Sequence, residues 1–190
     1  MFDYLGILIS IILGLALTHL LMGLSRLIQS PRTVRIYWVQ IVWTANVLIY
    51  VLAVWWGMFW WKHLQAWTVQ QFLFLSAYAI VLFMLASMLF PHEWKEDVDF
   101  EQHFFRNKTW FFGIQLLAFL MDIPETLAKS ADHLRDVPRE YLVFLPVMIG
   151  FNVIGLVTAN RRIHAVLGVT WLAVFVAYIT LTALDKIVAA

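Results

Sequence analysis

Cysteine is absent from this 190-residue chain, and charged residues make up only 13% of it. Without cysteine there is no disulfide framework and no thiolate to ligate a metal. A soluble domain carries about 25% charged and 45–50% apolar residues, whereas 63% of this chain is hydrophobic. The net charge of +1 gives no basic footprint for nucleic acid. These absences argue against a soluble domain or a nucleic-acid partner and predict a protein whose main contacts are membrane lipids.

Six long apolar segments fill most of the chain, and nearly all charges fall between them. A helix crosses the hydrocarbon core with about 20 mostly apolar residues. The segments that meet or approach this length are 4–25, 37–60, 69–90, 109–127, 141–159 and 163–184. The alternating segments of about ten residues that are typical of membrane β-barrels are missing from the sequence. We therefore predict an all-α fold, a compact bundle of six transmembrane helices that forms a single domain over residues 1–190.

The placement of lysine and arginine predicts how the bundle is oriented, because cytoplasmic loops collect these residues. With the N-terminus outside, eight of the 13 basic residues lie at the cytoplasmic ends of the segments: Arg26, Arg32, Arg35, Lys95, Arg106, Lys108, Arg161 and Arg162. The other five then lie outside: Lys62, Lys129, Arg135, Arg139 and Lys186. We expect both termini outside. Segment 4–25 lacks the basic start of a signal peptide and is expected to remain as a helix.

A few polar side chains interrupt the apolar segments at similar depths. Counted from the arginine-rich ends at 1.5 Å per residue, they lie roughly 10–14 Å into the bilayer. They are His19, Asn46, Gln115 and Asn152, with Thr18 and Thr170 in the same layer. Polar groups in hydrocarbon are costly and require partners, so two interpretations follow. The layer either lines a ligand or ion path, with His19 as its titratable member, or supplies hydrogen bonds between helices.

A second polar stretch covers residues 122–140, and its first acids lie at the edge of a span. Asp122 and Glu125 flank Pro124, which removes a backbone donor and kinks or ends a helix. One interpretation is an outer vestibule, lined by Asp122 and Glu125, that attracts cations. The other, which the pattern favours, is that the helix ends near residue 123 and a hydrated loop follows.

The charged connector 91–108 lies between the third and fourth segments. Phe100 and Phe104 fall one helical turn apart, which predicts a short interfacial helix. The connector also holds residues of the types that ligate metals: His92, Glu93, Glu96, Asp99 and His103. Their spacing matches no standard metal motif, and HEWKE is not HExxH. We predict a solvated amphipathic connector and no metal site.

Small and aromatic residues are arranged in ways that suggest contacts with other helices and with lipid. Gly6, Ser10 and Gly14 form a stripe at steps of four, which allows close helix packing inside the bundle or across a homo-oligomer. Aromatic residues near the segment ends predict belts at the two membrane interfaces. They include Trp38 and Trp110 at the inner side, and Trp55, Trp56, Trp61, Trp67 and Tyr141 at the outer side. A substrate-stacking role of the outer tryptophans is the alternative.

Two stretches of the sequence resemble a known group of proteins. The run SIILGLALTHLLMGLSRLI (10–28), followed by PRTVRIYWVQIVW (31–43), resembles the opening of small uncharacterised bacterial six-helix membrane proteins, and HFFRNKTWFFG (103–113) is similar. The resemblance covers about the first quarter and one later loop. It implies a location in the bacterial cytoplasmic (inner) membrane. No activity is attached to that group, so no functional residue carries over.

Three functions of different classes remain open. The leading hypothesis is a small-solute or ion channel or transporter whose path is the polar layer. The second is a non-catalytic partner or sensor that docks another protein through its basic turns and the connector 91–108. The third is a membrane-embedded enzyme or lipid-headgroup binder that uses histidines and acids near the inner face. No P-loop, glycine-rich fingerprint or serine-hydrolase constellation is present, so we assign no catalytic residue and no cofactor and favour a non-enzymatic role.

Overall fold

The protein is a bundle of six long helices in the computed structural model, which describes residues 2–29, 34–63, 67–91, 98–128 and 139–188. The helices are α1 (Phe2–Gln29), α2 (Trp38–Gly57), α3 (Val69–Ser87), α4 (Phe100–Ala128), α6 (Arg139–Val157) and α7 (Arg161–Val188), and the short 3₁₀ helix η1 (Met58–His63) continues α2. Each long helix contains a stretch that is long and apolar enough to cross a membrane. The predicted all-α bundle is confirmed, and the protein is a multi-pass membrane protein.

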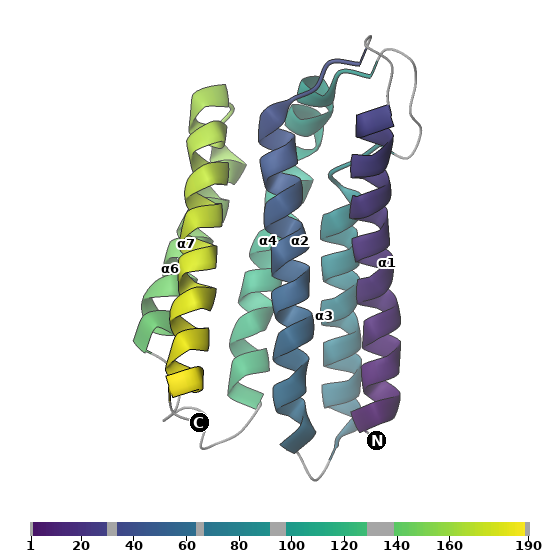
Figure 1. Cartoon of the computed structure of the whole chain (residues 1–190), viewed down its shortest axis with the longest axis vertical. Coiled ribbons are helices and arrows are strands. Elements are labelled where there is room, and N and C mark those ends of the chain that lie inside the picture. Colours follow the sequence, from purple (N-terminus) through teal and green to yellow (C-terminus); the bar gives the residue numbers. More distant parts are fainter. Residues whose placement is uncertain (1, 30–33, 64–66, 92–97, 129–138, 189–190) are drawn as a thin grey trace.

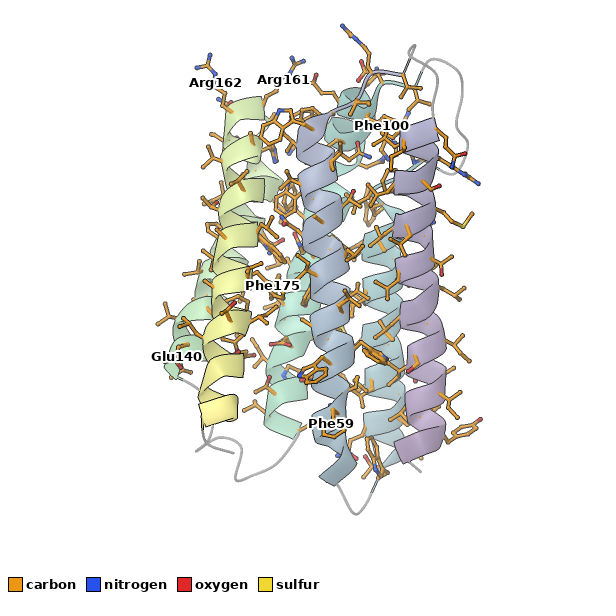
Figure 2. The ribbon with its side chains drawn as sticks, in the orientation of Figure 1. Phe59, Phe100, Glu140, Arg161, Arg162 and Phe175 are labelled. Carbon is orange, nitrogen blue, oxygen red and sulfur yellow. The ribbon has the colours of Figure 1, made fainter. Side chains whose placement is uncertain are left out.

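The helices run alternately up and down in two rows of three (Figure 1). One row contains α7, α2 and α1 and the other contains α6, α4 and α3, and neighbours within and between the rows are in contact. The first helix begins and the last helix ends at the same end of the bundle. Arg161 and Arg162 lie at the opposite end (Figure 2). This opposite end is called the arginine end below.

Local signals explain several of the helix boundaries. Thr68 and Gln71 form a reciprocal capping box at the start of α3, which satisfies two backbone N–H groups that a helix start leaves free. The tight turn before α7 uses Asn160, whose side chain accepts a hydrogen bond from the Arg162 backbone N–H at 2.9 Å. Apart from the start of α4, the predicted segments match the observed helices to within a few residues because charges, caps and prolines mark their ends.

The largest departure from the predicted boundaries is α4, which is continuous over 29 residues. Residues 100–108 are its first turns, so the predicted separate interfacial helix is wrong in the described part of the connector; residues 92–97 lie outside the described chain. The predicted helix end near residue 123 is also wrong, because α4 continues through Pro124 to Ala128. Interhelical hydrogen bonds to Asp122 and Glu125, described below, hold this last turn in place.

Close helix packing occurs at single glycines opposite aromatic rings. A Cβ atom added to Gly155 would lie 2.5 Å from the Phe112 ring, and one added to Gly23 would lie 2.3 Å from the Phe90 ring. The predicted stripe behaves differently: a Cβ at Gly6 or Gly14 would meet nothing within 4 Å. Among the described residues, these two glycines therefore face no close neighbour, whereas Ser10 Oγ accepts a hydrogen bond from Trp55 Nε1 of α2 at 3.1 Å. The part of the stripe in a homo-oligomer stays a prediction.

The aromatic residues divide between the surface and the core. Trp38, Trp55 and Trp56 are exposed at the ends of α2, as headgroup-contacting aromatics are. Trp110 is also exposed, in the third turn of α4. Trp61 was predicted to join the outer belt, but it is fully buried. Its indole N–H is used inside the bundle, where a polar tip requires a partner.

Candidate functional site

Three buried amide side chains lie at one depth in the centre of the bundle: Asn46 on α2, Gln115 on α4 and Asn152 on α6. Their side chains are 0%, 0% and 1% exposed. Helices α4 and α6 run antiparallel, and Phe112 of α4 packs against Gly155 of α6. Gln115 lies three residues after Phe112 and Asn152 lies three residues before Gly155, so the two amides are at the same depth. These three residues are called the amide layer below.

Ring contacts on α2 place Asn46 in the same layer. Trp43 packs edge-on against Phe112 at 5.1 Å between ring centroids, and Tyr50 stacks on Phe119 at 4.9 Å. Helices α2 and α4 run in the same direction. Asn46, between Trp43 and Tyr50, therefore lies level with Gln115, between Phe112 and Phe119. The common depth that the sequence indicates is present in the structure for these amides.

The amide layer is only partly satisfied by protein hydrogen bonds. Asn46 Nδ2 donates to the Gly168 carbonyl of α7 at 3.0 Å, and Asn152 Nδ2 donates to the Met148 carbonyl of its own helix at 2.8 Å. Within the described residues, the remaining side-chain atoms of the layer have no protein partner: Asn46 Oδ1, Asn152 Oδ1, Gln115 Oε1 and Gln115 Nε2. A closed set of interhelical hydrogen bonds is therefore not formed.

Two indole N–H groups next to the layer are also buried without a hydrogen-bond acceptor in the described part of the chain. Trp43 and Trp171 are fully buried, with ring centroids 6.2 Å apart, and neither Nε1 atom has a hydrogen-bond partner among the residues the structure describes. Trp43 Nε1 would lie 3.4 Å from a Cβ added to Gly168, the residue whose carbonyl accepts from Asn46. The donors thus lie within one helical turn of the amides.

Aromatic rings enclose the amide layer from both sides. Toward the arginine end, Trp43 packs with Phe111 and Phe112, and His164 stacks on Phe112 with a centroid distance of 5.4 Å. Toward the other end, the rings of Tyr50, Phe119, Trp171 and Phe175 contact one another, with Trp171 stacked on Phe175 at 4.7 Å. The layer is a polar section between two apolar aromatic ones.

The other residues predicted for the layer occupy less central positions. Thr18 is exposed on the outer face of α1. Thr170 Oγ1 donates to the Val166 carbonyl of its own helix at 2.7 Å. His19 is partly buried on α1, and α1 packs against α2 and α3. The layer at the bundle centre therefore consists of Asn46, Gln115 and Asn152.

A second polar group, here called the carboxylate cluster, lies near the end opposite the arginine end. Trp61 Nε1 donates to Glu125 Oε1 at 2.8 Å, and Glu125 is 4% exposed. Tyr141 Oη donates to Asp122 Oδ2 at 2.6 Å, and Tyr78 Oη lies 3.5 Å from Asp122 Oδ1. The structure therefore places Glu125 inside the bundle and Asp122, partly buried, among tyrosines. Their cation-attracting role stays a prediction.

Hydroxyl groups extend the carboxylate cluster toward the bundle centre. Tyr78 Oη and Tyr50 Oη lie 3.1 Å apart, and both side chains are buried. Tyr50 is one helical turn from Asn46, and its ring contacts Trp171. The sequence analysis missed Tyr50 and Tyr78, together with Trp43 and Trp171. Their signal in the sequence is weak, since each is an aromatic residue inside an apolar run.

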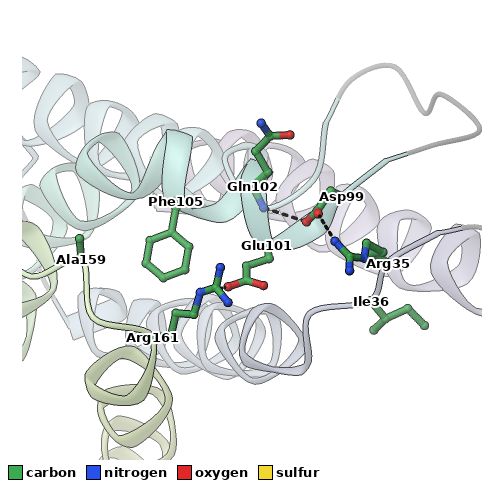
Figure 3. A pocket seen from close by; sticks show the side chains of 8 residues that line it. All are labelled: Arg35, Ile36, Asp99, Glu101, Gln102, Phe105, Ala159 and Arg161. Atoms are coloured by element: carbon green, nitrogen blue, oxygen red, sulfur yellow. Dashed lines mark hydrogen bonds and ion pairs between the residues drawn. The ribbon is translucent and has the colours of Figure 1, made fainter.

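Ion pairs and a pocket occupy the arginine end. Arg35 pairs with Asp99 at 3.4 Å, and Arg161 pairs with Glu101. These residues line a pocket of about 860 Å³ together with Ile36, Gln102, Phe105 and Ala159 (Figure 3). The backbone N–H of Gln102 donates to Asp99 at 3.0 Å, and this bond is the main cause that lowers the pKa of Asp99, helped by Arg35. Burial, and then Glu101, raise the pKa of Tyr37 beside this pocket to about 12.

The comparisons with known proteins give no match. No protein-family model matches the chain, and no curated protein or solved structure is significantly similar to it. Among the described residues, no group of three or more acidic or histidine side chains could hold a metal ion.

Proposed function

We propose that this protein moves a small solute or ion across the membrane and holds it at the amide layer during passage. The observation that supports this proposal is the set of buried amide atoms that have no partner among the residues the structure describes. Buried polar groups in proteins are nearly always hydrogen-bonded, and each exception calls for an explanation. A solute, or water that accompanies it, would supply the missing hydrogen bonds.

The position of the layer fits this role. The three amides come from three helices and lie near the middle of the bundle, between two aromatic sections that separate them from either end. A site enclosed on both sides is what a transporter in its occluded state requires, because the two sides of the membrane must not be open at once. We further propose a bacterial inner-membrane location with both termini outside, which the basic residues at the arginine end support.

Substitution of Gln115 is expected to affect transport without lowering the stability of the fold. Neither polar atom of Gln115 has a partner within the described chain, so Gln115→Leu breaks no protein hydrogen bond and removes the cost of burying an amide. Its thermal unfolding temperature in detergent is expected to equal or exceed that of the wild type. Asn46→Leu loses the bond to Gly168 and is expected to be destabilised by about 0.6 kcal/mol.

The experiment is flux into liposomes that contain the purified protein. We expect wild-type vesicles to pass at least one probe from a panel of K⁺, H⁺, urea and glycerol faster than empty vesicles. Gln115→Leu is expected to lose this flux while keeping its unfolding temperature. Thr170→Val is the matched control, because the Thr170 hydroxyl donates to the Val166 and Leu167 carbonyls of its own helix. If Gln115→Leu and Thr170→Val pass every probe at the wild-type rate, the proposal is wrong.

Docking of another protein is the second candidate function. The pocket at the arginine end favours it, because the Arg35 and Arg161 side chains are 84% and 74% exposed there and remain accessible to an acidic partner. Copurification of a partner that is lost when Arg35 and Arg161 are both replaced by alanine would support this function. The pocket does not account for the unpartnered amides at the bundle centre, so transport is the better-supported proposal.

A further inference from the structure

We infer that the amide layer binds a small uncharged polar molecule, of the size of urea, in preference to an ion. This inference rests on the proposed function, since it names the chemical class of the solute held at the same site. It is carried by three properties of the layer: the balance of its unpartnered donors and acceptors, the absence of charge at its depth and the aromatic rings around it.

The unpartnered atoms include donors and acceptors in similar measure. The acceptors are the side-chain oxygens of Asn46, Gln115 and Asn152, and the donors are Gln115 Nε2 and the indole nitrogens of Trp43 and Trp171. A metal cation is bound by oxygens and is repelled by N–H groups, whereas an anion is bound by N–H groups and is repelled by carbonyl oxygens. A neutral molecule that both donates and accepts hydrogen bonds uses both kinds of atom.

No charged side chain on the four surrounding helices lies at this depth. On α4 the nearest charges are Lys108 and Asp122, each seven residues from Gln115 and so about 10 Å away along the helix. Lys108 Nζ is already bonded to the Leu156 carbonyl at 2.8 Å. Within their described apolar stretches, α2, α6 and α7 carry no Asp, Glu, Lys or Arg near the layer. An ion held here would have no counter-charge, which is costly in a bundle core.

The aromatic rings set the size and the polarity of the molecule that fits. Trp43, Phe112, Phe119 and Trp171 are at most 1% exposed and pack edge-on or stacked around the layer. Selectivity in membrane pathways depends on the width of the passage and on the donors and acceptors that line it. Closely packed rings with a few amide and indole groups between them suit a planar or compact molecule of few atoms.

The experiment compares uncharged and charged probes in the same vesicles. Urea and glycerol entry is followed by stopped-flow light scattering, and K⁺ and H⁺ entry by fluorescent indicators inside the vesicles. We expect urea to enter wild-type vesicles at least several-fold faster than Gln115→Leu or Asn152→Leu vesicles. We expect K⁺ and H⁺ to enter all of them at the rate of empty vesicles. Thr170→Val is expected to match the wild type for every probe.

The outcomes separate this inference from the proposed function. If K⁺ or H⁺ flux depends on Gln115 while urea and glycerol flux does not, the proposed function stands and the inference of a neutral solute is overturned. If no probe depends on Gln115 or Asn152, both are overturned. A variant that fails to fold is recognised by its unfolding temperature. In that case Trp43→Phe is measured instead, because it removes one indole donor and keeps an aromatic ring. It is expected to show the same loss of urea flux.

Discussion

The buried amides and the buried carboxylate at Glu125 differ in how their polar atoms are bonded. Glu125 accepts a hydrogen bond from the buried indole of Trp61 at 2.8 Å, whereas both polar atoms of Gln115 are without a protein partner in the described structure. Bonded groups of this kind stabilise a fold, and unbonded ones reduce its stability. The Trp61–Glu125 pair therefore fits a structural role, and the bonding of Gln115 supports the proposed ligand-binding role.

Substitution of Trp61 by phenylalanine tests the structural role. Trp61→Phe removes a donor from a buried carboxylate, which is expected to lower the free energy of unfolding by about 1–3 kcal/mol. Thermal unfolding followed by circular dichroism in detergent measures the change. Trp56→Phe is the matched control, because Trp56 is 73% exposed, and it is expected to unfold at the wild-type temperature. Equal unfolding temperatures for the two variants would show that the bond to Glu125 contributes nothing.

At the scale of single elements, the sequence predicted that the six helices exist. It predicted less well where α4 begins and ends and how its polar side chains are bonded. Long apolar runs bounded by charges identify helices directly, because the bilayer fixes their length. The continuity of α4 was not predictable, because Pro124 is a local signal for a helix end and the bonds that outweigh it come from distant residues, Trp61 and Tyr141. The depth of the three amides followed from counting residues, but their unpartnered atoms required the structure.

The contact between α4 and α6 depends on a glycine that faces a ring. Gly155→Ala places a methyl group against Phe112, which is fully buried among other rings and has no room to move. We expect the unfolding free energy to fall by about 1–3 kcal/mol. Gly150→Ala on the same helix meets nothing within 4 Å and is expected to gain up to about 1 kcal/mol from helix propensity. A stabilised Gly155→Ala protein, measured by the same thermal unfolding, would contradict the packing described.

The start of α4 is expected to be sensitive to acid through Asp99. Its carboxylate accepts the Gln102 backbone N–H and pairs with Arg35, and its pKa lies below the ordinary value of 3.8. A carboxyl whose pKa is lowered by folding stabilises the fold above pH 4, and this contribution is lost as the pH falls through the lowered pKa. Asp99→Ala is expected to lose about 1 kcal/mol at pH 7. The difference in unfolding temperature between the two proteins should shrink below pH 4, and a difference that is constant from pH 7 to pH 3 would argue against a charged cap.

At the scale of the whole molecule, α1 begins and α7 ends opposite the arginine end. The absence of native cysteine allows the orientation to be tested by labelling. Single cysteines are introduced at Glu140 and at Arg162, which lie toward opposite ends of the bundle (Figure 2). With both termini outside, an impermeant maleimide added to intact cells is expected to label the Glu140→Cys protein and to label Arg162→Cys only after lysis. The reverse pattern would invert the proposed orientation without changing the fold.

The central claim is that the amide layer is a binding site rather than a set of structural contacts. An experimental structure in lipid nanodiscs, at a resolution that shows ordered water, tests it most directly. We expect density for water or a solute within hydrogen-bond distance of Gln115 and of the side-chain oxygens of Asn46 and Asn152. A dry layer, in which Gln115 donates and accepts directly between helices so that every amide atom is paired, would contradict it.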